Sequence, residues 1–102
     1  MKQEGGTPSK FRWEPKKGSG WVSLALTLKV LDELSPLRMR GAAKAVAEVR
    51  EGRGAPITER MAWLHLNYAL RAGYAEVVTL EGVPCYRLTE KGAEFLKKTL
   101  GI

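Results

Sequence analysis

Residues 71–92 read RAGYAEVVTLEGVPCYRLTEKG, and this stretch decides the fold. Two short runs, 74–80 and 84–89, are rich in the β-branched and aromatic residues that strands favour, and a Glu-Gly pair between them supplies a turn. The pattern predicts a β-hairpin, with Pro84 at a strand start or on a sheet edge because proline cannot donate to a ladder. A hairpin is barely stable alone, so this one must pack against helices or another extended segment.

Helical patterns lie on both sides of this hairpin. Four segments have helical character, namely 19–36, 40–51, 57–73 and 89–102. Their expected boundaries are N-caps at Ser19, Thr58 and Thr89 and stops at Pro36 and Gly73. Residues 36–40, after the proline, are short and extended. The order helix, extended piece, helix, helix, hairpin, helix predicts an α+β domain that is mostly helical.

The first helix is apolar on nearly every side. Trp21, Leu24 and Leu28 form one stripe, while Val22 and Leu26 point in other directions, so little polar face remains. Such a helix needs cover on more than one side. In so small a protein the second cover comes either from the N-terminal arm or from a partner subunit, and the latter would make a homodimer.

The totals limit the class of protein. With 102 residues and 44% apolar side chains the chain is one domain, and no apolar run is long enough to span a membrane. No secretion signal is recognisable, so a cytoplasmic protein is expected. A single cysteine, Cys85, and a single histidine, His65, cannot form a disulfide or the usual zinc sites, and no metal or cofactor is expected. Few amides and cysteines beside many Arg, Glu and Ala are typical of thermophile proteins.

Positive charge indicates a polyanionic partner. The chain holds 17 basic and 11 acidic residues, a net +6, and nucleic acid is the commonest cytosolic polyanion. An anionic membrane surface, an acidic protein or a mere gain in solubility would also account for this charge. The distribution favours binding, because residues 36–47 contain Arg38, Arg40 and Lys44 and no acid.

Residues 1–20 read as a flexible basic arm, followed by one domain at 21–102. The arm interleaves Phe11 and Trp13 with four cations, Lys10, Arg12, Lys16 and Lys17. The rings could stack on bases while the cations neutralise phosphates. Alternatively, the rings fold back and cover apolar surface of the domain.

A family resemblance rests on the segments HLNYALRAGYAEV (65–77) and YRLTEKGAEFL (86–96) with the hairpin between them. Together they resemble the winged helix-turn-helix DNA-binding domains of archaeal and bacterial transcription regulators. The pattern of Leu66, Leu70, Gly73 and Tyr74 is similar to the end of their recognition helix. The resemblance covers roughly residues 21–100.

The resemblance implies that the third helix, 58–72, enters the major groove of double-stranded DNA and that the second helix abuts phosphates. Asn can pair with adenine, Arg with guanine, and an apolar ring can pack on a thymine methyl. The residues that this helix would present to DNA are Thr58, Glu59, Arg60, Trp63, Asn67 and Arg71. Positive charge gathers just before it, at Arg38, Arg40, Lys44, Arg50 and Arg53, and this distribution favours phosphate contacts there, together with those of Arg87 and the arm cations. Trp63 is equally compatible with burial.

Two features depart from the family pattern. The tip of the hairpin carries Glu81 and no Lys or Arg, so Arg87 is the one cation available for a phosphate contact there. The connection REGRGAP between the second and third helices is longer than a tight helix-turn-helix turn. The acidic tip favours an alternative, in which the domain is a protein–protein interaction module of a transcription or replication assembly.

No motif supports an enzyme. The chain lacks the glycine-rich phosphate loop, HExxH and GxSxG, and Asp32 and Glu33 are sequential, so their side chains diverge on a helix. A DNA-binding regulator is therefore the leading prediction and a docking module its alternative. Single-strand binding through the arm is a variant of the first.

Overall fold

The computed structural model describes residues 12–102, whose elements follow one another in the order expected from the sequence. These are α1 (Ser19–Leu34), β2 (Leu37–Arg38), α2 (Ala42–Gly52), α3 (Glu59–Ala72), β3 (Ala75–Leu80), β4 (Val83–Leu88) and α4 (Glu90–Leu100). Residues 12–102 therefore form a mostly helical α+β fold with four helices and one small antiparallel sheet, which confirms the expected class at this level. Lys10 and Phe11 lie outside the described residues.

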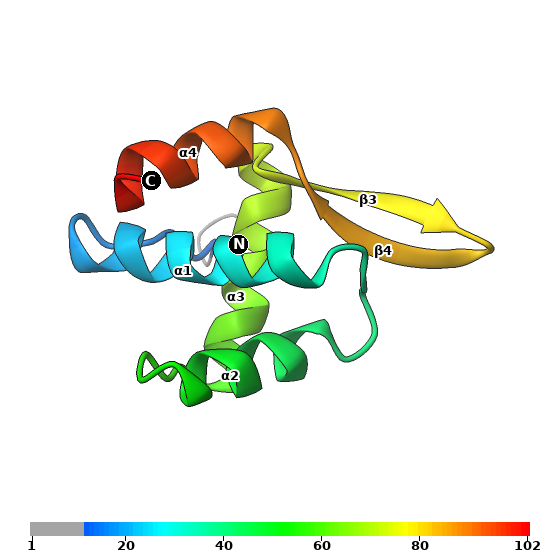
Figure 1. Ribbon diagram of the computed structural model, residues 1–102, viewed down its shortest axis with the longest axis horizontal. Helices are drawn as coiled ribbons and strands as arrows, with labels where there is room; N and C mark the ends of the chain where they lie inside the picture. The colour runs from blue at the N-terminus through cyan, green and yellow to red at the C-terminus, as the bar shows by residue number, and fades with distance from the viewer. Residues whose placement is uncertain (1–11) are drawn as a thin grey trace, which may run out of the picture.

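The helix α1 lies at the centre of the helical body. In Figure 1 it runs between α4 on one side and α2 on the other, and α3 crosses behind it. Leu24, Leu28 and Leu31 are fully buried in this arrangement, so neighbouring elements of the same chain cover most of the apolar helix. Val22 and Leu34, near its two ends, stay exposed at 42% and 37%.

The hairpin leans on the short extended segment, as its marginal stability requires. The strand order is β2-β4-β3, with Leu37 opposite Tyr86 in one ladder and Val77 opposite Tyr86 in the other. The hairpin projects beyond the helical body (Figure 1). Glu81 and Gly82 both have positive φ, 51° and 80°. These angles are those of the two-residue hairpin turn whose twist matches that of the paired strands.

Pro84 is tolerated inside the central strand because α2 supplies the hydrogen bond that proline cannot make. Pro84 is the second residue of β4, and its carbonyl accepts from the Met39 N–H at 3.0 Å. In a regular ladder Pro84 would donate back to the Met39 carbonyl. That carbonyl instead accepts from the Ala42 N–H at 3.2 Å, at the first residue of α2.

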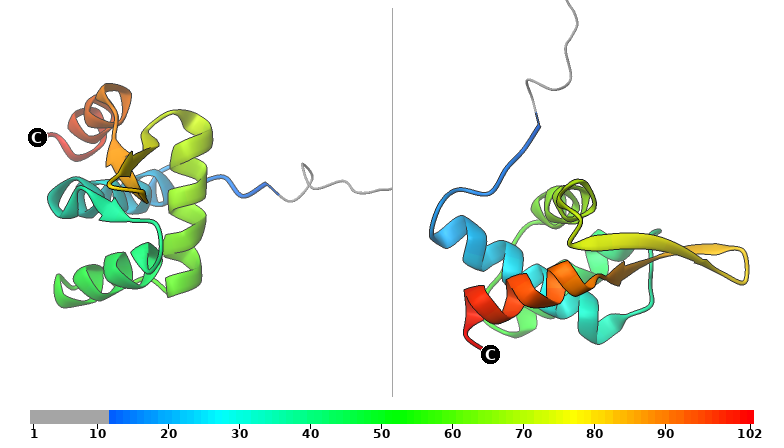
Figure 2. Two further views of the ribbon diagram at one scale, coloured as in Figure 1. Left: turned by 90° about the vertical axis from the view of Figure 1, so that its right-hand side faces the viewer. Right: turned by 90° about the horizontal axis from the view of Figure 1, so that it is seen from above.

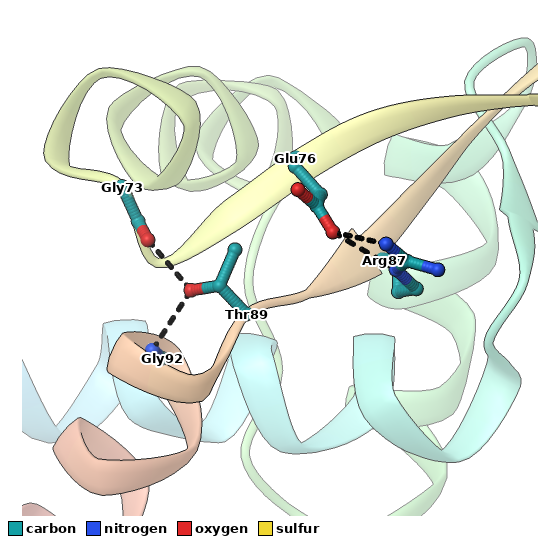
Figure 3. Close-up of polar contacts among 5 residues, drawn as sticks. All are labelled: Gly73, Glu76, Arg87, Thr89 and Gly92. Atoms are coloured by element: carbon teal, nitrogen blue, oxygen red, sulfur yellow. Dashed lines mark hydrogen bonds and ion pairs between the residues drawn. The ribbon is translucent and has the colours of Figure 1, made fainter.

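Capping residues fix the ends of α3 and the start of α4 where the sequence predicted them. The Thr58 hydroxyl accepts from the Met61 N–H at 3.0 Å, and Gly73 ends α3 with φ 83°. The Thr89 hydroxyl accepts from the Gly92 N–H at 3.1 Å and donates to the Gly73 carbonyl at 2.6 Å, so it joins the two helices (Figure 3).

The expected N-cap at Ser19 is wrong. Ser19 is the first helical residue of α1, and Gly18 occupies the cap position with φ 75° and no side chain to bond the first turn. Glycine adopts a positive φ without steric cost, so Gly18 can take the cap position, and α1 begins one residue earlier than expected. Among residues 12–102, no helix has the length and apolarity needed to cross a bilayer.

Candidate nucleic-acid interface

The helix α3 carries a polar line on its solvent side. Ala62, Leu66 and Ala69 are buried against the core, and Arg60 and Asn67 lie on the opposite side, seven residues apart and therefore almost in line along the helix. Caps at both ends supply hydrogen bonds to its first and last turns.

Trp63 is exposed, which settles the alternative left open by the sequence. Its side chain is 55% exposed, and it lines an open hollow of about 370 Å³ with Ala43, Glu59 and Arg60. Ala43 belongs to the first turn of α2, so the hollow lies where α2 meets the N-terminal half of α3. The hollow combines an aromatic ring with one cation and one carboxylate at its rim.

Three exposed cations lie within five residues of Ala43, which lines this hollow, and one of them, Arg38, itself lines a separate hollow beside Glu81. Arg38 is on β2, and Arg40 and Lys44 flank the start of α2, on either side of the hollow's Ala43. Within residues 12–102 none of the three makes an ion pair or a side-chain hydrogen bond, and the same holds for Arg60. Their charge is therefore not neutralised by any described side chain.

Arg50 does not belong to this positive surface, although the sequence suggested that it would. It is 4% exposed, and its Nη1 donates to the Ser23 carbonyl at 2.8 Å and to the Thr27 hydroxyl at 3.1 Å. Its Nε donates to the Ala55 carbonyl at 2.9 Å. Arg50 thus ties α2 and the following connection to α1, and a buried charge of this kind needs such partners.

Arg53 and Arg87, two of the predicted DNA contacts, are each paired with a carboxylate. Arg53 bonds Glu33 on α1, and that hydrogen bond, helped by Lys29, lowers the pKa of Glu33 below its usual 4.5. Arg87 reaches across the hairpin to Glu76, with Nε at 2.9 Å from the carboxylate (Figure 3). Either guanidinium would have to exchange its partner before it could contact a phosphate.

His65 is fully buried and part of a polar network. Arg50 donates to the Thr27 hydroxyl, so that hydroxyl has its proton free to donate to Nδ1 of His65, 2.7 Å away. Burial, and then the charge of Arg50, lowers the pKa of His65 from 6.5 to about 4. The imidazole is therefore neutral at pH 7, and the network is structural.

The described part of the arm lies against α3. The Trp13 ring packs 5.2 Å from His65 and 6.0 Å from Tyr68 between ring centroids, and Pro15 is buried. Nη2 of Arg71 donates to the Trp13 carbonyl at 2.7 Å, and the same guanidinium lies over the Tyr68 ring. The ring of Trp13 therefore covers part of the domain, which is the second of the two alternatives for the arm.

Among residues 12–102, no cluster of three or more His, Cys, Asp or Glu side chains could hold a metal ion. Cys85 is buried, with Sγ 3.6 Å from the Val83 carbonyl, and His65 is used by the network above.

The structure brings together Arg60, Trp63 and Asn67 on α3, next to the start of α2 with Arg40 and Lys44. Arg12, Lys16 and Lys17 of the arm are exposed, whereas the Thr58 hydroxyl is occupied as an N-cap. Comparisons with models of known protein families, with curated proteins and with solved structures found no match for the chain. The interpretation of this surface therefore rests on its own residues.

Proposed function

We propose that this chain is a small winged-helix DNA-binding protein that acts as a transcription regulator. In this proposal α3 enters the major groove of double-stranded DNA, the hairpin is the wing, and the start of α2 and the arm contact phosphates. The observation that carries the proposal is the combination on one surface of an outward polar line on a capped helix and cations without described partners.

The chemistry of the outward side chains fits base edges. Asn67 can bond adenine through both its amide atoms, and Arg60 can do the same with O6 and N7 of guanine. The exposed ring of Trp63 can pack on a thymine methyl beside them. Phosphate contacts would position the protein without reading sequence, and the cations near α2 supply them.

The number of available cations sets the expected salt dependence. Six exposed cations could each neutralise one phosphate, namely Arg12, Lys16, Lys17, Arg38, Arg40 and Lys44. Six such contacts would lower the affinity about a thousandfold between 50 and 200 mM salt. The hairpin would add little, because its one arginine is bonded to Glu76 and its tip carries Glu81.

A homodimer is part of the proposal. Val22 and Leu34 leave apolar surface exposed at the two ends of α1, and pairing of two chains through α1 or α4 would cover it. A two-fold dimer would present two copies of α3 to half-sites one DNA turn apart, roughly 34 Å. Sedimentation at two protein concentrations would report this association directly.

A second candidate function is a protein-docking module, and the exposure of Trp63 favours it. Trp63 is 55% exposed at the edge of a hollow. Tryptophan is one of the residues that most often act as hot spots in protein–protein interfaces. The exposed Val77 and Leu80 of the hairpin and its acidic tip point the same way. A docking module would bind duplex DNA weakly or not at all.

Fluorescence anisotropy with a labelled random duplex tests the proposal. The full chain is titrated at several salt concentrations between 50 and 200 mM, beside a variant in which Arg38, Arg40 and Lys44 are alanine. The variant should lower the slope of log K against log salt by about 3, since each phosphate contact contributes about 0.9. A control with Lys97→Ala and Lys98→Ala, exposed on α4, should change it little. If the full chain does not bind at 50 mM salt, the docking function becomes the better account.

A further inference from the structure

The arm packs on α3. Both views of Figure 2 show residues 12–18, drawn in blue, leaving the helical body on the side of α3. Trp13 packs on His65 and Tyr68, and its carbonyl accepts from Arg71, so ring and backbone are both held. Pro15 is buried a few residues further on.

These contacts change what each arm residue can do. The Trp13 ring is partly buried between two ring systems of α3, so stacking on a base would require it to leave them. Arg71 is likewise engaged, because it holds the Trp13 carbonyl and covers the Tyr68 ring. The neighbouring cations are all exposed, so their charges face the solvent; they are Arg12, Lys16 and Lys17.

The arm and the start of α2 lie on different flanks of α3. The α2 flank is marked by the hollow between Ala43 and Trp63, and the arm flank by the Trp13–Tyr68 contact. Trp63 and Tyr68 are five residues apart, so they leave the helix in clearly different directions, with the Arg60–Asn67 line between them. A duplex lying on that line has cations on both sides.

We propose that Trp13 is a positioning residue that anchors a phosphate-binding arm. By holding the arm on α3 it places Arg12, Lys16 and Lys17 against the sugar-phosphate backbone of double-stranded DNA, and the arm does not stack on bases. This inference rests on the proposed DNA-binding function. Its physical reason is preorganisation: a segment ordered in the free protein loses less conformational freedom on binding and acts at a high effective concentration.

A double-mutant cycle on the full chain tests the anchor. The four proteins are the wild type, Trp13→Ala, the pair Lys16→Ala with Lys17→Ala, and all three substitutions together. The lysine pair should lower the slope of log K against log salt by about 2, so its affinity deficit shrinks about tenfold from 50 to 200 mM. Trp13→Ala should lower slope and affinity in the same sense, although it removes no charge.

The triple variant and a fifth protein, Trp13→Phe, decide the mechanism. If Trp13 acts through the arm cations, Trp13→Ala costs less in the lysine-pair background than alone, because only Arg12 is left for it to position. Trp13→Phe keeps the wild-type affinity because a ring is retained. If Trp13→Ala costs as much in the lysine-pair background as alone, the residue acts through α3 and the proposal is overturned. Tighter binding to a single-stranded oligonucleotide than to the duplex, lost in Trp13→Ala, would overturn it in favour of base stacking.

A readout without DNA separates this inference from the proposed function. Backbone ¹⁵N relaxation should find residues 12–17 as ordered as α3 in the wild type and Trp13→Phe, and mobile on the nanosecond timescale in Trp13→Ala. If the wild type fails to bind any duplex while this result holds, the proposed function fails and the anchor stands as a structural contact. Mobile residues 12–17 in the wild type would refute the anchor itself.

Discussion

Acidification below pH 6.5 should destabilise this protein first through one residue. His65 is the only histidine in the chain, it is 1% exposed, and its Nδ1 accepts the hydrogen bond of Thr27. Protonation would remove that acceptor and place a second positive charge beside buried Arg50. The folded state therefore binds the proton more weakly than the unfolded chain does.

The size of the effect follows from the two pKa values. The pKa of His65 is about 4 in the folded state, against 6.5 when the ring is free. Between these values the unfolded chain binds more protons, so the free energy of unfolding falls as the pH falls. Each pH unit in this window removes about 1.4 kcal/mol, so the loss is roughly 2 kcal/mol at pH 5 and 3 kcal/mol at pH 4. Above pH 6.5 the stabilisation is fully present.

Urea unfolding at half-unit steps from pH 7.5 to 4 measures this loss, with His65→Gln as the control. Glutamine does not titrate, and its carbonyl can still accept from Thr27, so the variant lacks the His65 slope between pH 6.5 and 5. The lowered pKa of Glu33 adds acid sensitivity to both proteins, but only below its usual 4.5. A wild-type curve parallel to that of His65→Gln, or an NMR titration of the ring with its midpoint near 6.5, would refute the buried network.

Two further changes test the packing with matched controls. Gly92→Ala would place a Cβ 2.1 Å from the Tyr74 carbonyl oxygen, so we expect a loss of about 3 kcal/mol in urea unfolding, whereas Gly52→Ala enters open space at the end of α2 and should cost nothing. Arg50→Ala leaves buried groups without their donor and should destabilise by about 3 kcal/mol, while Arg53→Ala removes an exposed ion pair worth less than about 1 kcal/mol. Equal effects within either pair of variants would contradict the burial assigned to these positions.

The elements that could be predicted from the sequence are those fixed by local chemistry. Thr58 and Thr89 each have a side-chain oxygen that bonds the first turn of a helix, and Gly73 takes the left-handed angle that ends one. The hairpin follows from two strand-like runs around a glycine turn. All of these features depend on residues that are close together in the sequence, so the residues that cause each feature can be recognised from the sequence alone.

The features that could not be predicted depend on residues far apart in the chain. Trp13 meets α3 across more than fifty residues, and Arg71 holds it there. The burial of Arg50 was indicated by its spacing. Ala42, Val46 and Arg50 are four residues apart and so share the buried side of α2. Its charge argued for the surface, but the oxygens of α1 that accept its hydrogen bonds cannot be seen in the sequence of α2.

Net charge therefore overstates the charge that is available for binding. Several of the seventeen basic residues are already used within residues 12–102: Arg50 in the core, Lys29 and Arg53 on Glu33, Arg87 on Glu76, Arg71 on the arm, and Lys91 on the Ala72 carbonyl. Arg40 and Lys44 at the start of α2 and Arg12, Lys16 and Lys17 in the arm are exposed and have no such bonds to described residues. These two groups lie on different flanks of α3, with the outward line of that helix between them. Lys97 and Lys98 on α4 are exposed as well. Variants of the cations beside α3, compared with Lys97→Ala and Lys98→Ala, therefore test whether DNA binding depends on where the charge lies rather than on its total.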